Sequence, residues 1–119
     1  MRPCILVVDD DPTIRTALRR ALRRAGHEVV EAEDGEVAVA RLRAEGPFAA
    51  MTLDMDMPKK RGSEVLVEAL ALQPELRVIV IAGHLDADDK RALLAAGAAA
   101  CFDKPFDPEA VLAALAPRP

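Results

Sequence analysis

The sequence predicts an α/β fold in which helices cover a doubly wound parallel sheet. Short apolar runs alternate along the chain with longer stretches of helical period, which is typical of repeated strand–helix–strand units. Hydrophobic residues make up 51% of the 119 residues, enough for one sizeable core, while the length leaves no room for a second. We therefore expect a single domain over residues 1–119, with a core at 3–116 and a tail at 117–119.

The strands are predicted from the apolar runs, each of which is short and rich in Val, Ile, Leu or Ala. Continuous apolar runs of strand length are expected where a parallel sheet is buried on both faces. We place the strands at about residues 4–8, 28–32, 49–53, 77–82 and 99–103.

The first and last helices have recognisable beginnings. Asp11 precedes Pro12 and Asp107 precedes Pro108, so each aspartate can cap a helix whose first residue is proline. Within the first helix, apolar residues recur at spacings of three and four, and arginines occupy the other side. The packed face is made of Ile14, Ala17, Leu18, Ala21, Leu22 and Ala25, and the solvated face of Arg15, Arg19, Arg20, Arg23 and Arg24.

Glycine and proline mark the places where the helices end. Gly26 follows the first helix, the Gly-Pro pair at 46–47 follows the second, and Gly97 follows the fourth. The third helix, at about 63–72, is followed by the Gln-Pro pair at 73–74. The elements therefore alternate from strand to helix five times.

Composition narrows the class of protein. The only aromatic residues are three phenylalanines, so base stacking has little to work with, and the formal net charge of −4 argues weakly against binding to a nucleic-acid backbone. We expect no direct nucleic-acid binding. Cys4 and Cys101 lie in predicted strands without metal-ligand or disulfide spacing, which favours reduced cytosolic thiols. The first apolar run is too short for a signal peptide or a membrane span. We expect a cytoplasmic protein without a membrane contact.

Charged residues stand where three of the predicted strands end. Asp9 and Asp10 follow the first strand, Asp54 follows the third, and Lys104 follows the fifth. In a doubly wound sheet, ligands bind beyond the carboxyl ends of the strands, at the point where the winding reverses. Three carboxylates and one ammonium at that edge predict a divalent-metal site beside a phosphate partner.

Three segments resemble the signatures of receiver domains of two-component response regulators, of the chemotaxis-regulator-like kind. They read ILVVDDD at 5–11, LDMDMP at 53–58 with Gly62, and DKPF at 103–106. The resemblance covers essentially the whole chain, in order. It implies a flavodoxin-like sheet in the order 2-1-3-4-5, flanked by five helices.

The resemblance also implies a phosphorylation switch. Asp54 matches the residue that takes a phosphoryl group from a phosphohistidine of a histidine kinase or a phosphotransfer domain, with Mg2+ as cofactor and Mn2+ as an acceptable substitute. Asp10 matches a direct metal ligand, Asp9 a ligand that acts through water, and Asp56 a residue that lends its backbone carbonyl to the metal. Lys104 matches the lysine that pairs with the acyl phosphate.

This chemistry agrees with elementary electrostatics. A carboxylate that attacks a phosphoryl group brings two anions together, so a metal ion and a lysine lower the barrier by neutralising the equatorial oxygens. Neighbouring carboxylates repel one another in the metal-free state, and a divalent cation relieves that repulsion. Metal binding and phosphorylation are therefore expected to be coupled.

Two switch positions depart from the family pattern. The family carries Thr or Ser at the end of the fourth strand, where this chain has Ala82, although the backbone N–H of Gly83 could still serve the phosphoryl group. The aromatic position three residues before Lys104 is Cys101, and Phe102 cannot replace it because successive strand residues face opposite ways. We expect a phosphorylated protein in which the usual rearrangement of the fourth strand and helix is reduced or follows another route.

The surroundings of the site leave alternatives open. His84 lies where the family tunes dephosphorylation, and it is equally an exposed loop histidine. The arginine face of the first helix is a nucleic-acid stripe, a docking surface or a solvated face, and the resemblance favours kinase or phosphotransfer docking near Arg15 and Arg19. Helices at 87–96 and 108–116 would form the family's dimer face, so we expect a monomer or a weak homodimer.

Two other functions compete with the switch. Asp54 and Asp56 superficially match the nucleophile motif of haloacid-dehalogenase-like phosphatases, but Pro58 stands where that motif wants Thr or Val. A pseudo-receiver would keep the fold as a binding module without phosphorylation, and Ala82 and Cys101 favour it. We expect no enzymatic activity beyond self-phosphorylation and autodephosphorylation at Asp54. The chain is expected to be either a single-domain regulator or a fragment of a longer protein.

Overall fold

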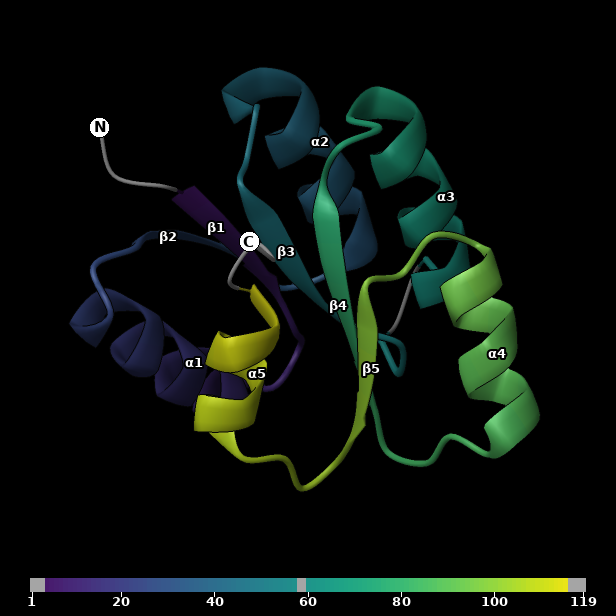
Figure 1. The fold of residues 1–119 in the computed structure, drawn as a ribbon. Helices are drawn as coiled ribbons and strands as arrows, with labels where there is room; N and C mark the ends of the chain where they lie inside the picture. Colours follow the sequence, from purple (N-terminus) through teal and green to yellow (C-terminus); the bar gives the residue numbers. More distant parts are fainter. Residues whose placement is uncertain (1–3, 58–59, 116–119) are drawn as a thin grey trace.

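A five-stranded parallel sheet forms the centre of the molecule (Figure 1). The computed structural model describes residues 4–57 and 60–115. The strands stand in the order β2-β1-β3-β4-β5, so the predicted α/β fold and strand order are confirmed. Their bounds are Cys4–Val8 for β1, Glu28–Ala32 for β2, Ala50–Asp54 for β3, Arg77–Ala82 for β4 and Ala100–Asp103 for β5.

Five helices alternate with the strands in the described part of the chain. Their bounds are Pro12–Arg24 for α1, Gly35–Glu45 for α2, Gly62–Leu72 for α3, Ala87–Ala95 for α4 and Pro108–Leu115 for α5. Pro58 and the predicted tail at 117–119 lie outside the described residues. Over the described ranges, no helix combines the length and the apolar character needed to cross a membrane.

The predicted strands agree with the observed ones to within one residue. Three strands match their predicted bounds, β3 lies one residue later than predicted, and β5 begins one residue later. Asp54 belongs to β3 because its Cα is in register with Ile81 of β4, and the next N–H, that of Met55, donates to the Ile81 carbonyl at 2.9 Å. The sheet therefore continues up to the aspartate itself.

Helices cover the sheet on both faces. Helices α1 and α5 lie together on one face, and α2, α3 and α4 lie on the other (Figure 1). Alternate residues of one strand serve the two layers, since Leu6 and Val8 of β1 belong to the α2–α4 cluster while Ile5 and Val7 belong to the α1–α5 cluster. All four of these side chains are buried. The continuous apolar runs of the sequence arise from this burial on both faces.

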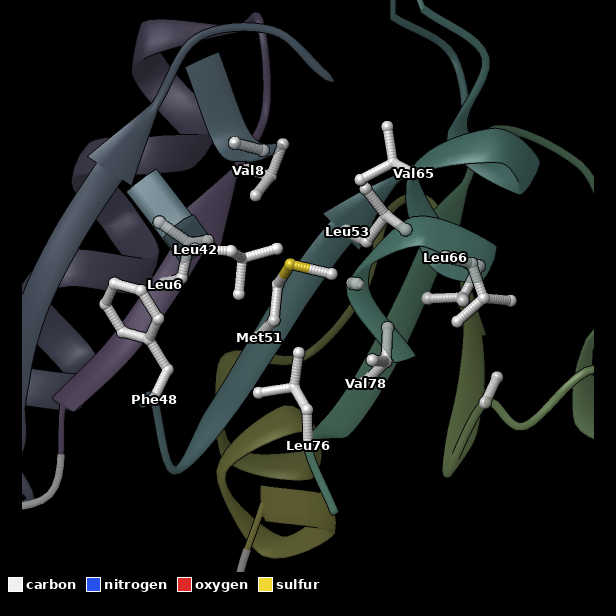
Figure 2. Packing of buried hydrophobic residues seen from close by; sticks show 14 of the residues in the cluster. Leu6, Val8, Leu42, Phe48, Met51, Leu53, Val65, Leu66, Leu76 and Val78 are labelled. Carbon is white, nitrogen blue, oxygen red and sulfur yellow. The ribbon is translucent and has the colours of Figure 1, made fainter. Parts of the chain in front are cut away.

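The larger core lies between the sheet and helices α2 to α4. Figure 2 shows Met51 at its centre, with Phe48 and Leu42 on one side and Leu53, Val65 and Leu66 on the other. The Gln73 side chain closes the end of this core, because its amide accepts from the Phe48 N–H at 2.8 Å and donates to the Phe48 carbonyl at 2.7 Å. The loop before β3 is thereby tied to the end of α3.

Aspartates begin four of the helices. Asp11 accepts from the Thr13 N–H at 2.8 Å and Asp107 from the Glu109 N–H at 3.0 Å, as the sequence predicted. Asp34 and Asp86 cap α2 and α4 in the same way, and neither was predicted. Gly26 and Gly97 end α1 and α4 at φ of 95° and 114°, a conformation that favours glycine.

Candidate functional site

The ends of β1, β3 and β5 bring the predicted charged residues to one edge of the sheet. Val8 of β1 is in register with Leu53 of β3, so Asp9 and Asp54 follow as neighbours. One carboxylate oxygen from each of Asp9, Asp10 and Asp54 lies within 4.8 Å of the other two. The Lys104 Nζ lies 3.2 Å from Asp54 Oδ1 and 4.0 Å from Asp9 Oδ2. Three carboxylates and one ammonium therefore converge.

Asp9 is a buried carboxyl, only 1% exposed. The pKa of Asp9 is raised to about 6, chiefly by burial. The negative charge of Asp54 raises the pKa further, whereas the Asp11 N–H and the charge of Lys104 lower it. Its Oδ1 accepts from the Asp11 N–H at 2.9 Å. Asp9 therefore ionises less readily than an exposed aspartate.

Asp54 is equally buried, and its two oxygens have different surroundings. Oδ1 accepts from the Asp56 N–H at 3.0 Å and lies beside Lys104, whereas Oδ2 is buried and has no hydrogen-bond partner among the residues that the structure describes. Burial raises the pKa of Asp54, and the Asp56 N–H and Lys104 oppose the rise. A buried acceptor oxygen without a partner is costly unless a ligand serves it.

The donor set fits a hard divalent cation. Mg2+ prefers carboxylate oxygens and keeps several waters, and this site offers exposed Asp10 beside buried Asp9 and Asp54. Oδ2 of Asp54 adds a buried acceptor oxygen that a cation could coordinate. The role predicted for the Asp56 backbone carbonyl stays a prediction.

Lys104 is held at the site by its backbone as well as by its side chain. Its N–H donates to the Ala82 carbonyl at 2.7 Å, which fixes the end of β5 to the end of β4. Burial lowers the pKa of Lys104, but the hydrogen bond to Asp54 and the charges of Asp54 and Asp9 outweigh that effect, so the pKa is raised. The ammonium is therefore charged at neutral pH.

The atypical switch positions lie where the sequence placed them. Ala82 is buried at the end of β4 and His84 is exposed beyond it. Cys101 packs against the α2–α4 cluster, whereas Phe102 packs against the α1–α5 cluster, so Phe102 does not occupy the face that Cys101 leaves without a ring. The prediction from strand alternation is confirmed.

Two carboxylates hold the loop between β4 and α4. The Gly83 N–H donates to Asp56 Oδ2 at 2.7 Å, and the Leu85 N–H donates to Asp103 Oδ1 at 3.0 Å. Lys90 of α4 donates to the other oxygen of Asp103 at 3.2 Å, and that bond is the main cause of the lowered Asp103 pKa. Sequence reasoning missed both bonds, because a side-chain contact between segments far apart in the sequence leaves no periodic signal.

The arginines predicted to lie near a docking site are engaged within the chain. Glu31 of β2 accepts from Arg15 Nε at 3.3 Å and from Arg19 at 3.0 Å. Arg15 also donates to the Asp9 carbonyl at 2.7 Å. These arginines therefore brace β2 and the turn after β1.

An apolar groove lies beside the site, with a volume of about 340 Å³. The groove runs between the first turns of α1 and the loop that joins β5 to α5. Its lining is Thr13, Ile14 and Ala17 on α1, Lys104, Pro105 and Phe106 on the loop, and Pro108 at the start of α5. Sequence analysis did not predict this groove.

The sequence is similar to that of known proteins over nearly its whole length. Residues 5–116 match the family model described as the response regulator receiver domain. The chain is 39% identical over 116 residues to the transcriptional regulatory protein PrrA of Mycobacterium tuberculosis, covering 98% of this chain and 48% of that protein. It is 36% identical over 111 residues to the response regulator MprA of Mycolicibacterium vanbaalenii, at 93% and 48% coverage. The chain spans about half the length of these relatives.

Solved structures agree with the sequence comparison. A response regulator receiver domain protein (CheY-like) from Methanospirillum hungatei superposes with a TM-score of 0.88 at 30% identity, covering 95% of this chain and 90% of that one. A response regulator from Burkholderia pseudomallei, solved with a phosphorylated aspartic acid, a calcium ion and citrate, gives a TM-score of 0.86 at 28% identity, covering 96% and 66%.

Proposed function

The chain belongs to the response regulator receiver domain family, and from this premise we propose that it is a Mg2+-dependent phosphoacceptor switch with Asp54 as the acceptor. The phosphoryl donor is a phosphohistidine on a histidine kinase or a histidine phosphotransfer domain. Asp54 Oδ2 attacks the phosphorus, the bond from phosphorus to the histidine nitrogen breaks, and the imidazole leaves with the electron pair.

One observation carries this proposal. Asp54 has a fully buried carboxylate in which one oxygen is paired and the other has no partner within residues 4–57 and 60–115. Lys104 and the Asp56 N–H hold Oδ1, which leaves Oδ2 as the oxygen available to a phosphoryl group. Lys104 also supplies a positive charge near the transferred oxygens, and Mg2+, when bound by Asp9, Asp10 and Asp54, neutralises further charge on them.

A solved relative supports the same chemistry. The response regulator of Burkholderia pseudomallei carries a phosphorylated aspartic acid and a calcium ion in one structure. The acidic cluster of this chain would bring a cation and an acyl phosphate together in the same way, because its carboxylate oxygens lie within 4.8 Å of one another.

The proposal is tested by the intact mass of the chain after incubation with acetyl phosphate and Mg2+. We expect the gain of one phosphoryl group, abolished by Asp54→Ala and by removal of Mg2+ with a chelator. Asp11→Ala is a matched control, because Asp11 caps α1 beside the site and should leave the gain intact. No gain in the wild-type chain contradicts the proposal.

The pseudo-receiver is the second candidate. Ala82 and Cys101 remove the hydroxyl and the aromatic ring of the usual switch, and a side chain of this protein already occupies the Gly83 N–H. The mass experiment separates the two functions, because a binding module needs no phosphoryl group. If the gain is seen, the altered positions instead reduce or redirect the rearrangement of β4 and α4.

The phosphodonor is proposed to dock in the apolar groove rather than on the arginines. The groove opens beside Lys104 and thus beside the acceptor, whereas Arg15 and Arg19 are paired with Glu31. Ile14→Glu should slow phosphoryl transfer from a phosphorylated histidine phosphotransfer domain while leaving the reaction with acetyl phosphate unchanged. Equal slowing of both reactions contradicts this docking site.

The remaining expectations follow the family. We propose a cytoplasmic location and a monomer or weak homodimer. Helices α4 and α5 flank β5, the edge strand of the sheet, and would form the dimer face (Figure 1).

A further inference from the structure

We infer that the Asp56 carboxylate competes with a phosphoryl group on Asp54 for the N–H of Gly83. Asp56 is thus a positioning residue that opposes phosphorylation and that phosphorylation displaces. The inference rests on the proposed function, since it requires a phosphoryl group on Asp54.

The geometry places one residue between the acceptor and the loop after β4. The Asp56 N–H donates to Asp54 Oδ1 at 3.0 Å, and the Asp56 side chain accepts from the Gly83 N–H at 2.7 Å. Gly83 directly follows the end of β4, whose Ile81 is in register with Asp54. The contact therefore spans the two loops that border the acceptor.

Gly83 matters more here because its neighbour lacks a hydroxyl. Ala82, at the end of β4, has no donor in its side chain, and its carbonyl is taken by the Lys104 N–H. The first backbone N–H beyond the strand is that of Gly83, and the Asp56 carboxylate holds it. A phosphoryl group that uses this N–H must replace one anion by another, because a single N–H does not serve both well.

A second hydrogen bond holds the loop between β4 and α4 and limits how far the displacement at Gly83 extends. The Leu85 N–H is bound to Asp103, whose other oxygen is bound to Lys90 of α4. A phosphoryl group on Asp54 competes with Asp56 but not with Asp103. The expected response is a local change at Gly83 and His84 while Leu85 and the start of α4 stay in place.

The decisive readout is the backbone amide resonance of Gly83, followed by nuclear magnetic resonance in the whole chain. Without metal, Asp56→Ala should move this resonance toward higher field, because the amide loses a charged acceptor. Asp56→Asn, a neutral variant of the same size, should give an intermediate position. With saturating Mg2+ and beryllofluoride, a mimic of the phosphoryl group, wild type and Asp56→Ala should converge on the same position, because both amides then bind the mimic.

Affinity supplies a second readout. At a Mg2+ concentration that saturates each variant, Asp56→Ala should bind beryllofluoride about three- to tenfold more tightly than wild type, since no carboxylate must be displaced. Asp103→Asn is the matched control, because it removes the same charge from the neighbouring anchor. It should leave the position of the Gly83 resonance unchanged, and it should leave the affinity for beryllofluoride within about twofold of wild type.

Each outcome bears on a different claim. The competition is overturned if the Gly83 resonance does not move in Asp56→Ala. It is also overturned if beryllofluoride shifts the Leu85 resonance of wild type but not the Gly83 resonance. Equal tightening by Asp56→Ala and Asp103→Asn overturns it as well, because the effect is then one of charge alone. Failure of every variant to bind beryllofluoride or to accept a phosphoryl group overturns the proposed function and the competition together, and the intact mass of wild type identifies that case.

Discussion

Replacing Asp9 by Asn should stabilise the metal-free protein at neutral pH. The carboxyl is 1% exposed, and burial raises its pKa from 3.8 to about 6. A folded-state pKa above the unfolded value means that the folded protein binds the proton more tightly. The stability from this group is therefore fully present below pH 3.8 and is lost as the pH rises through about 6.

The magnitude follows from the difference between the two pKa values. At about 1.36 kcal/mol per pH unit, ionised Asp9 costs up to about 3 kcal/mol at neutral pH. Asp9→Asn removes this cost and keeps an oxygen to accept the Asp11 N–H. The melting temperature should rise by roughly 10 °C near neutral pH in the presence of a chelator, and the gain should shrink toward zero near pH 4.

Urea unfolding followed by far-ultraviolet circular dichroism measures this effect, because the chain has no Trp or Tyr to report by fluorescence. Exposed Asp10 provides the control, and Asp10→Asn should change the free energy of unfolding by less than about 0.5 kcal/mol without metal. The reasoning is refuted if Asp9→Asn is no more stable than wild type near neutral pH, or if its advantage is the same near pH 4.

Three further predictions concern the metal, the lysine and the core. Mg2+ at a hundredfold excess over its dissociation constant should stabilise wild type by about 2.7 kcal/mol, as read from thermal melting. Asp10→Asn should lose most of this gain, and equal gains in the two proteins count against a metal at Asp10. Lys104→Met should lower the free energy of unfolding in urea by about 1 to 3 kcal/mol near neutral pH, because Asp54 loses its ion pair. The loss should be smaller near pH 4, and a loss that does not depend on pH argues against the pair. Gln73→Ala should cost about 2 kcal/mol in the same assay, since both Phe48 backbone groups lose their partner; a cost below about 0.5 kcal/mol contradicts that role.

Much of the fold was predictable because burial leaves a periodic trace in the sequence. The strands of a sheet covered on both faces appear in the sequence as continuous apolar runs. Asp11 and Asp107 each precede a proline, which predicts the start of a helix. The cluster of Asp9, Asp10, Asp54 and Lys104 was predictable for a related reason, since parallel strands bring their carboxyl ends to one edge.

The side-chain contacts between distant segments were not predictable in this way. The bond from Gly83 to Asp56 joins residues 27 positions apart, and the bond from Leu85 to Asp103 joins residues 18 apart, so neither follows from local spacing. The pairing of Arg15 and Arg19 with Glu31 depends on how α1 packs beside β2. Side-chain partners that are distant in the sequence are fixed by tertiary packing, and a single sequence records only which groups are available.

The most direct test of the central claim is to locate the phosphoryl group itself. After reaction with acetyl phosphate and Mg2+, borodeuteride reduces an acyl phosphate to labelled homoserine, and peptide mapping by mass spectrometry finds its position. We predict label at residue 54 alone, where the buried Oδ2 has no hydrogen-bond partner in the described part of the chain. Label at Asp9 or Asp10 with none at Asp54, or no label at all, would contradict the account.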